Sequence, residues 1–98
     1  MTENGACFAD AAAADGRVDD RERIAFLRAH LAACHRALAQ KSNLRGYFVW
    51  TILDNFEWAE GYAAPFGLVR VDRASLRRTP KASYGWFARV ARSNRLDS

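Results

Sequence analysis

Cysteine, proline and long apolar runs are all scarce in this sequence. It contains two cysteines, Cys7 and Cys34, and two prolines in 98 residues. The cysteines show neither Cys-x-x-Cys nor Cys/His ligand spacing, which argues against a disulfide framework and a zinc site. The apolar runs fall far short of the roughly 20 residues that a membrane-spanning helix needs, and no basic leader precedes an apolar core. We therefore expect a soluble, cytoplasmic protein with no membrane partner and no metal ion.

Acidic residues are the minority among the charged ones. Fifteen Lys and Arg against eleven Asp and Glu leave a net charge of +4. Arginines gather at Arg70, Arg73, Arg77 and Arg78, but neither a continuous basic face nor a nucleic-acid-binding motif accompanies them. Charge alone would favour a basic nucleic-acid-binding protein. We interpret the excess as an ordinary solvated surface and expect no nucleic-acid partner.

Hydrophobic residues make up half of the chain, which predicts a packed rather than a disordered protein. The stretch from Ala6 to Asp20 is interrupted by Asp and Gly and is expected to be a surface loop. An Asp19/Glu22 pair predicts the N-cap of a helix that begins at Arg21. Apolar residues then recur at steps of three and four and predict one packed helix face, made of Ile24, Leu27, Leu31, Cys34 and Leu38.

Two strands and a closing helix are predicted further along. The continuous apolar run at 46–52 predicts a strand buried on both faces, as in parallel sheets, and 66–72 predicts a second, short strand. Thr79-Pro80 predicts an N-cap and first turn. The helix would extend from Lys81 to about Arg92, with its packed side formed by Tyr84, Phe87 and Ala91, and residues after it would fray. This order of elements indicates an α/β fold.

Two segments of the sequence stand out as motifs. They are Thr2-Glu3-Asn4-Gly5 and Trp50-Thr51-Ile52-Leu53-Asp54-Asn55-Phe56-Glu57-Trp58. Together they resemble the nucleophile and sugar-binding motifs of glycoside hydrolase family 1, the β-glucosidase family. The segments Phe66-Gly67-Leu68-Val69 and Arg78-Thr79-Pro80-Lys81-Ala82-Ser83-Tyr84 extend the resemblance over nearly the whole chain.

The resemblance implies that residues 1–98 form the C-terminal portion of a (β/α)8 TIM barrel. This portion would comprise about the last two β/α units, from the nucleophile motif to the end of the barrel. A closed barrel needs roughly 250 residues, so the fold is incomplete in this chain. The missing N-terminal barrel portion is therefore an expected partner.

The resemblance also implies roles for five side chains. Retaining glycosidases use two carboxyl groups about 5 Å apart, and Glu3 matches the nucleophile. In the family, the residue that matches Trp50 packs beneath the sugar ring. The residue that matches Glu57 accepts hydrogen bonds from the outer hydroxyls of the sugar, and the residue that matches Trp58 donates a hydrogen bond to a neighbouring hydroxyl. Phe66 matches an aromatic residue of the same pocket. No cofactor is implied.

The carboxylate of Glu57 bears on the substrate. Branches of the family that act on 6-phosphorylated sugars replace it with a small hydroxyl residue, because a carboxylate repels phosphate. We therefore expect an unphosphorylated β-glucoside, β-galactoside or oligosaccharide, and hydrolysis of its terminal sugar with retention through a covalent glycosyl-enzyme.

The Asn-Glu-Pro motif that carries the acid/base glutamate of the family does not occur in these 98 residues. General acid catalysis contributes roughly 10²–10⁴-fold to rate, so the isolated chain is expected to be almost inactive. The alternative is a non-catalytic carbohydrate-binding or structural remnant of the barrel.

Overall fold

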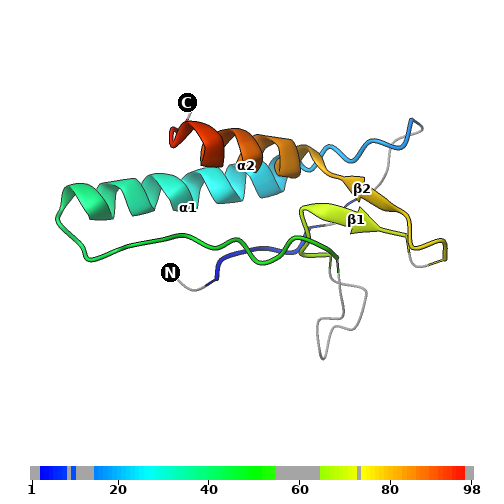
Figure 1. Cartoon of the computed structure of the whole chain (residues 1–98), viewed down its shortest axis with the longest axis horizontal. Coiled ribbons are helices and arrows are strands. Elements are labelled where there is room, and N and C mark those ends of the chain that lie inside the picture. Colours follow the sequence, from blue (N-terminus) through cyan, green and yellow to red (C-terminus); the bar gives the residue numbers. More distant parts are fainter. Residues whose placement is uncertain (1–2, 9, 11–14, 55–64, 73, 97–98) are drawn as a thin grey trace.

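The computed structural model describes residues 3–8, 10, 15–54, 65–72 and 74–96. Within these residues, four elements follow one another: α1 (Arg21–Ala39), β1 (Val69–Val71), β2 (Arg78–Pro80) and α2 (Ala82–Ser93). Figure 1 shows α1 and α2 packed side by side. After α1 the chain returns beneath the helix pair in an extended conformation, and it then reaches the hairpin of β1 and β2.

Helix α1 confirms the predicted helix but not its predicted cap. The N-cap residue is Asp20, and its side chain makes no capping hydrogen bond. Its carboxylate instead accepts hydrogen bonds from the backbone N–H of Ser83 at 2.8 Å and from Arg23. The Asp19/Glu22 prediction was therefore wrong: the N-cap position is one residue later, and the exposed Asp19 carboxylate pairs with Arg21 at 2.8 Å instead.

Helix α2 starts later than predicted. Arg78–Pro80 pairs antiparallel with β1, with Thr79 opposite Arg70 and Pro80 opposite Val69, so the N-cap residue is Lys81. Proline is tolerated here because a two-stranded ribbon consists of edge strands only.

The packed side of α2 also differs from the predicted one. Ser83 and Trp86 are buried, whereas Tyr84 and Ala91 are exposed. Phe87 is half-buried and packs against the core as predicted. Leu96 also packs against the core, so the predicted fraying does not extend to this residue.

The turn between β1 and β2 is built on Asp72. Its carboxylate accepts the Ser75 hydroxyl at 2.9 Å and the Ala74 N–H at 3.2 Å. These bonds hold the pKa of Asp72 below its ordinary value, since they favour the ionised form. Leu76 completes the turn with a positive φ of 61°.

The predicted strand at 46–52 is extended but is not a strand of a sheet. Val49 forms a parallel bridge with Asn4, and Leu53 forms another with Val69. Burial on both faces was also wrong, because Phe48 is 63% exposed and Ile52 is 59% exposed. The helices cover only the opposite face of this segment, so its second face meets solvent in this chain.

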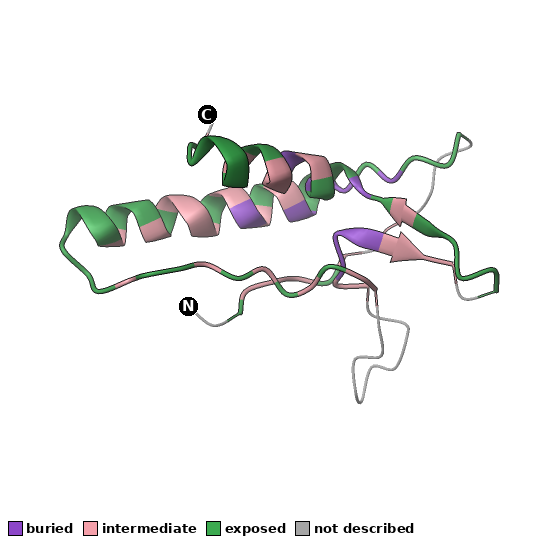
Figure 2. Ribbon diagram, viewed as in Figure 1, coloured by how far each residue is buried: buried purple, intermediate pink, exposed green. Residues whose placement is uncertain are grey.

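The core lies between the two helices and the residues that precede β1. Leu27, Leu68 and Trp86 are its buried members, and Figure 2 shows burial concentrated where the starts of the helices meet the β1–β2 hairpin. The predicted loop at 6–20 also contributes, since Val18 and Asp20 are buried. The last residues of the predicted loop are therefore packed rather than on the surface.

Candidate functional site

Backbone hydrogen bonds hold the two motif segments side by side. The Asn4 N–H donates to the Phe48 carbonyl at 3.0 Å, and the Trp50 N–H donates to the Asn4 carbonyl at 2.9 Å. These bonds flank the parallel Asn4–Val49 bridge. Glu3 and Trp50 therefore lie on neighbouring extended segments although they are far apart in the sequence.

The two faces of this pair of segments differ. On the face toward the helices, the Tyr47 hydroxyl donates to the side-chain oxygen of Asn4, and Val49 packs against the core. Because side chains alternate along an extended chain, Glu3 and Trp50 lie on the opposite face. Glu3 is exposed and Trp50 is 39% exposed.

Tyr47 is a permanent donor in this contact. Burial, with a smaller contribution from nearby Cys34, raises its pKa to about 12. The phenol therefore stays protonated at physiological pH and keeps its hydrogen bond to Asn4.

Gly5 allows the segments to approach closely. A Cβ atom at this position would lie 1.9 Å from the carbonyl oxygen of Trp50, well inside any allowed contact. Only glycine fits here without a shift of one backbone against the other.

A third stretch of chain pairs with residues 51–54. Leu68 donates its N–H to the Thr51 carbonyl at 3.0 Å, and the Asp54 N–H donates to the Val69 carbonyl at 3.1 Å. This pairing places half-buried Phe66 next to the end of the extended segment. Of the predicted sugar-binding residues, Glu57 and Trp58 lie outside the described residues.

A group of buried charged and polar residues, the buried polar cluster, was not found from the sequence. Arg23 contacts Asp10 at 2.8 Å and Asp20 at 2.5 Å, and Lys81 contacts Asp10 at 2.5 Å and Asp54 at 2.9 Å. The side chains of both basic residues are at most 1% exposed. Ser83 completes the cluster through its hydroxyl bond to Asp20.

Each basic side chain of the cluster contacts two carboxylates, and Asp10 is shared between them, so three carboxylates face two cations. Burial alone would lower the pKa of Arg23, but hydrogen bonds and attraction from Asp10 and Asp20 outweigh it and raise the pKa. The sequence did carry one signal of this site. Arg23 lies four residues before Leu27, on the buried face of α1, where a charged residue requires a buried partner.

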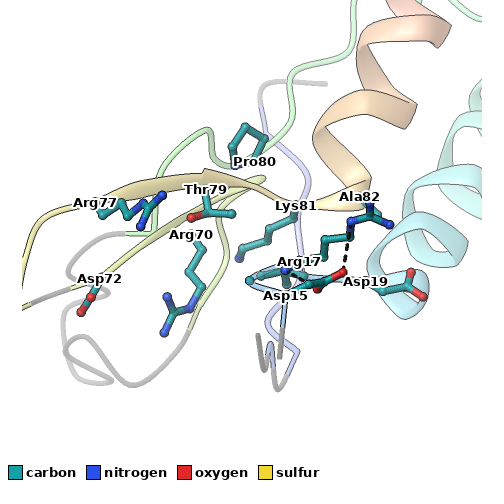
Figure 3. Close-up of a pocket in the computed structure, with 12 residues that line it drawn as sticks. Asp15, Arg17, Asp19, Arg70, Asp72, Arg77, Thr79, Pro80, Lys81 and Ala82 are labelled. Carbon is teal, nitrogen blue, oxygen red and sulfur yellow. Dashed lines mark hydrogen bonds and ion pairs between the residues drawn. The ribbon is translucent and has the colours of Figure 1, made fainter. Parts of the chain in front are cut away.

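A pocket of about 740 Å³ lies on another part of the surface (Figure 3). It is formed by residues 15–19, the β1–β2 hairpin and the start of α2, and neither Glu3, Trp50 nor Phe66 lines it. Its basic and acidic side chains include Arg17 and Asp15, which pair with each other at 3.3 Å. Among the described residues, the predicted nucleophile and sugar-binding side chains are therefore not part of its wall.

The described residues offer no obvious metal site. No group of three or more His, Cys, Asp and Glu side chains among them could hold an ion. The carboxylates that do gather, in the buried polar cluster, face Arg23 and Lys81. Within the same described part of the chain, no helix is long and apolar enough to cross a membrane.

Comparison with known proteins identifies the family. The model of glycosyl hydrolase family 1 matches residues 1–96. The chain belongs to this family. Beta-glucosidase A of Thermotoga maritima is 47% identical over 97 residues, which are 99% of this chain and 22% of that protein. The 6-phospho-beta-galactosidase of Streptococcus equi subsp. zooepidemicus is 40% identical over 93% of this chain and 19% of that protein.

A solved family 1 structure has the same backbone. The family 1 β-glucosidase from Thermotoga maritima matches with a TM-score of 0.98 and 47% identity, over 100% of this chain and 22% of that one. The same enzyme has been solved in complex with isofagomine lactam. The chain thus spans about a fifth of the length of the family 1 proteins that it matches.

Proposed function

We propose that the chain is the C-terminal portion of a retaining β-glucosidase barrel, with residues 1–98 forming one part of a single catalytic domain. The observation that supports this most directly is the pairing of Asn4 with Val49, which puts the Glu3 and Trp50 segments side by side. Two motifs that match one family are thereby brought into one place.

Glu3 is the proposed nucleophile. In a retaining mechanism its carboxylate attacks the anomeric carbon, while an acid from another part of the barrel protonates the departing glycosidic oxygen. The covalent glycosyl-enzyme is then hydrolysed by water, which the same second residue deprotonates as a base. The exposed position of Glu3 leaves it open to a substrate.

The proposed sugar contacts combine stacking and hydrogen bonding. Trp50 would pack beneath the ring and Phe66 would line the pocket, while Glu57 and Trp58 would bind the outer hydroxyls. The substrate is then a terminal β-D-glucosyl or β-galactosyl residue without a 6-phosphate, because the carboxylate of Glu57 disfavours that group.

The exposed apolar face supports the view that more of the barrel is needed. Phe48, Trp50 and Ile52 are all substantially exposed on the same face as Glu3. The rest of the barrel would cover this face and supply the acid. The isolated chain is accordingly expected to be inactive.

A direct test is to complete the barrel. Residues 1–98 would be joined to the part of Thermotoga maritima β-glucosidase A that this chain does not match, to give the "completed barrel". We expect it to hydrolyse an aryl β-glucoside, with an aryl β-galactoside as the second candidate, and to be far slower on an aryl β-glucoside 6-phosphate. A folded completed barrel that hydrolyses none of them, or that prefers the phosphate, would contradict the proposal.

A non-catalytic carbohydrate-binding or structural remnant is the second candidate. It is favoured by the core of Leu27, Leu68 and Trp86, which forms within this chain. Cooperative unfolding of the isolated chain together with glucose binding would support it.

A further inference from the structure

We propose that Asp54 is a positioning residue for the sugar site, held by Lys81, and that it places Phe66 by fixing Gly67. The inference rests on the proposed function, because Phe66 contacts sugar only in that proposal. It adds a role for the buried polar cluster, which the chemistry of the site does not otherwise use.

A single oxygen atom of Asp54 connects three parts of the chain. Its Oδ1 accepts the Gly67 N–H at 2.8 Å and the Lys81 Nζ at 2.9 Å. Asp54 also lies in the extended segment that carries Trp50, and its own N–H donates to the Val69 carbonyl. The carboxylate therefore joins that segment to the residue after Phe66.

Lys81 is a rigid anchor for this carboxylate. Its side chain is fully buried, and its Nζ makes a second contact, at 2.5 Å, with Asp10. Its backbone N–H donates to the Leu68 carbonyl at 2.9 Å at the start of α2. A lysine held at both ends has little freedom to follow a displaced Asp54.

The residue before Phe66 is held by the same cluster. The Arg23 Nη2 donates to the Pro65 carbonyl at 2.7 Å. Arg23 is itself fixed by Asp10 and Asp20. Phe66 thus lies between two residues whose backbones are bound to buried charged side chains.

The contact at Gly67 leaves no room for adjustment. A Cβ atom there would lie 2.3 Å from the Asp54 nitrogen and 2.5 Å from the Leu53 carbonyl carbon. The two backbones are therefore already in close contact, and movement of Asp54 would move Gly67 and with it Phe66.

Asp10 provides a matched control for Asp54. The Asp10 and Asp54 side chains are 3% and 12% exposed, and the carboxylate of each accepts a hydrogen bond from Lys81 Nζ. Removing either leaves two carboxylates and two basic groups in the cluster. Asp10 bonds Arg23 and Lys81 rather than Gly67. In Asp10→Ala, Lys81 keeps its bonds to Asp54 and Leu68, and Arg23 keeps its bonds to Asp20 and Pro65, so the backbone on both sides of Phe66 stays held.

The experiment compares Asp54→Ala, Asp54→Asn and Asp10→Ala in the completed barrel. The measurements are the thermal midpoint, kcat and KM on an aryl β-glucoside, and the Kd for deoxynojirimycin, with which the Thermotoga maritima enzyme has been solved. We expect Asp54→Ala to lower kcat/KM and weaken binding by about 10-fold or more, because a displacement of about 1 Å can cost about 100-fold. Asp54→Asn keeps an acceptor oxygen and should recover most of this loss.

Asp10→Ala should lower the thermal midpoint at least as much as Asp54→Ala, yet change kcat/KM and Kd by less than about 3-fold. Equal losses of activity and binding in the two alanine variants would overturn the proposal, since they would mean that only stability was affected. An unchanged Kd in Asp54→Ala would overturn it as well.

Amide hydrogen exchange in the unsubstituted completed barrel provides a test that needs no variant to fold. The Gly67 amide should exchange as slowly as those of Leu68 and Val69. Free exchange at Gly67 would show that Asp54 does not hold it and would overturn the proposal. This result does not depend on turnover, so it is distinct from a failure of Glu3 as the nucleophile.

Discussion

At the scale of single residues, the position of Glu3 depends on its neighbour Gly5. The carboxylate faces solvent, so its own contacts do little to fix it. Two backbone hydrogen bonds of Asn4, with Phe48 and Trp50, hold the segment that carries Glu3. These bonds require glycine at position 5, because the backbone there passes close to the Trp50 carbonyl. A glycine far from any turn is thus part of the proposed catalytic apparatus.

Gly5→Ala is expected to separate the two motif segments in the completed barrel. The added methyl group would overlap backbone atoms, which costs about 1–3 kcal/mol or more in unfolding free energy. Turnover of an aryl β-glucoside should fall together with stability. Gly16→Ala is the control, because Gly16 has nothing within 4 Å and only its φ of +86° disfavours alanine. Wild-type activity in Gly5→Ala would contradict the importance of this contact.

Tyr47 predicts a pH dependence of stability. Its pKa is raised from 10.0 to about 12 in the folded chain, so between these values the unfolded state loses the proton first. The contribution of the Tyr47 phenol to the free energy of unfolding is therefore complete below about pH 10, and it is lost as the pH rises toward about 12.

Denaturant unfolding of the completed barrel between pH 8 and pH 11 would measure this effect. The difference in unfolding free energy between wild type and Tyr47→Phe should shrink above pH 10, because phenylalanine has no proton to lose. A difference that stays constant over this range would contradict the raised pKa.

At the scale of elements, the helices were predictable because their apolar periodicity survives in a single sequence. Helix α1 begins at Arg21 as predicted, and Leu27 is fully buried on its packed face. Its last predicted core residue, Leu38, is 49% exposed, because the far end of α1 extends beyond α2. Local periodicity indicates a face but not how far a partner covers it.

Leu27→Ala and Leu38→Ala test this difference. Truncation of the fully buried Leu27 should cost about 2–5 kcal/mol in unfolding free energy. Truncation at Leu38 should cost about 0.5 kcal/mol or less, as is usual at exposed positions. Denaturant unfolding of both variants in the completed barrel provides the comparison, and equal losses would contradict the core assignment.

The missed features depend on contacts between distant parts of the chain. Thr79-Pro80 has the local pattern of a helix start, but pairing with β1 makes it a strand instead. The carboxylate of Asp20 is recruited by Ser83, which is 63 residues away. No pattern within a short window reports such partners, whereas the family motifs at Glu3 and Trp50 are local and could be read directly.

At the scale of the whole molecule, the chain has one covered and one uncovered side. The helices cover the side of Tyr47 and Val49, while Phe48 and Ile52 are exposed on the side of Glu3. The extended segments are also paired through isolated bridges rather than through a continuous sheet. Both features agree with a chain that matches about 22% of a family 1 enzyme.

The buried polar cluster holds segments that are far apart in the sequence next to one another. It connects residue 10, both helices and the ends of the extended segments through Arg23 and Lys81. We therefore expect the site segments to keep their mutual arrangement when the rest of the barrel is added.

The most direct test of the central claim is covalent labelling with a 2-fluoro-glucosyl inactivator, followed by peptide mass analysis. It would be applied to the chain of residues 1–98 alone and to the completed barrel. We predict a label on Glu3 in the completed barrel and none in the isolated chain. A folded completed barrel that carries no label, or carries it on another residue, would contradict the assignment of Glu3 as the nucleophile of a retaining β-glucosidase.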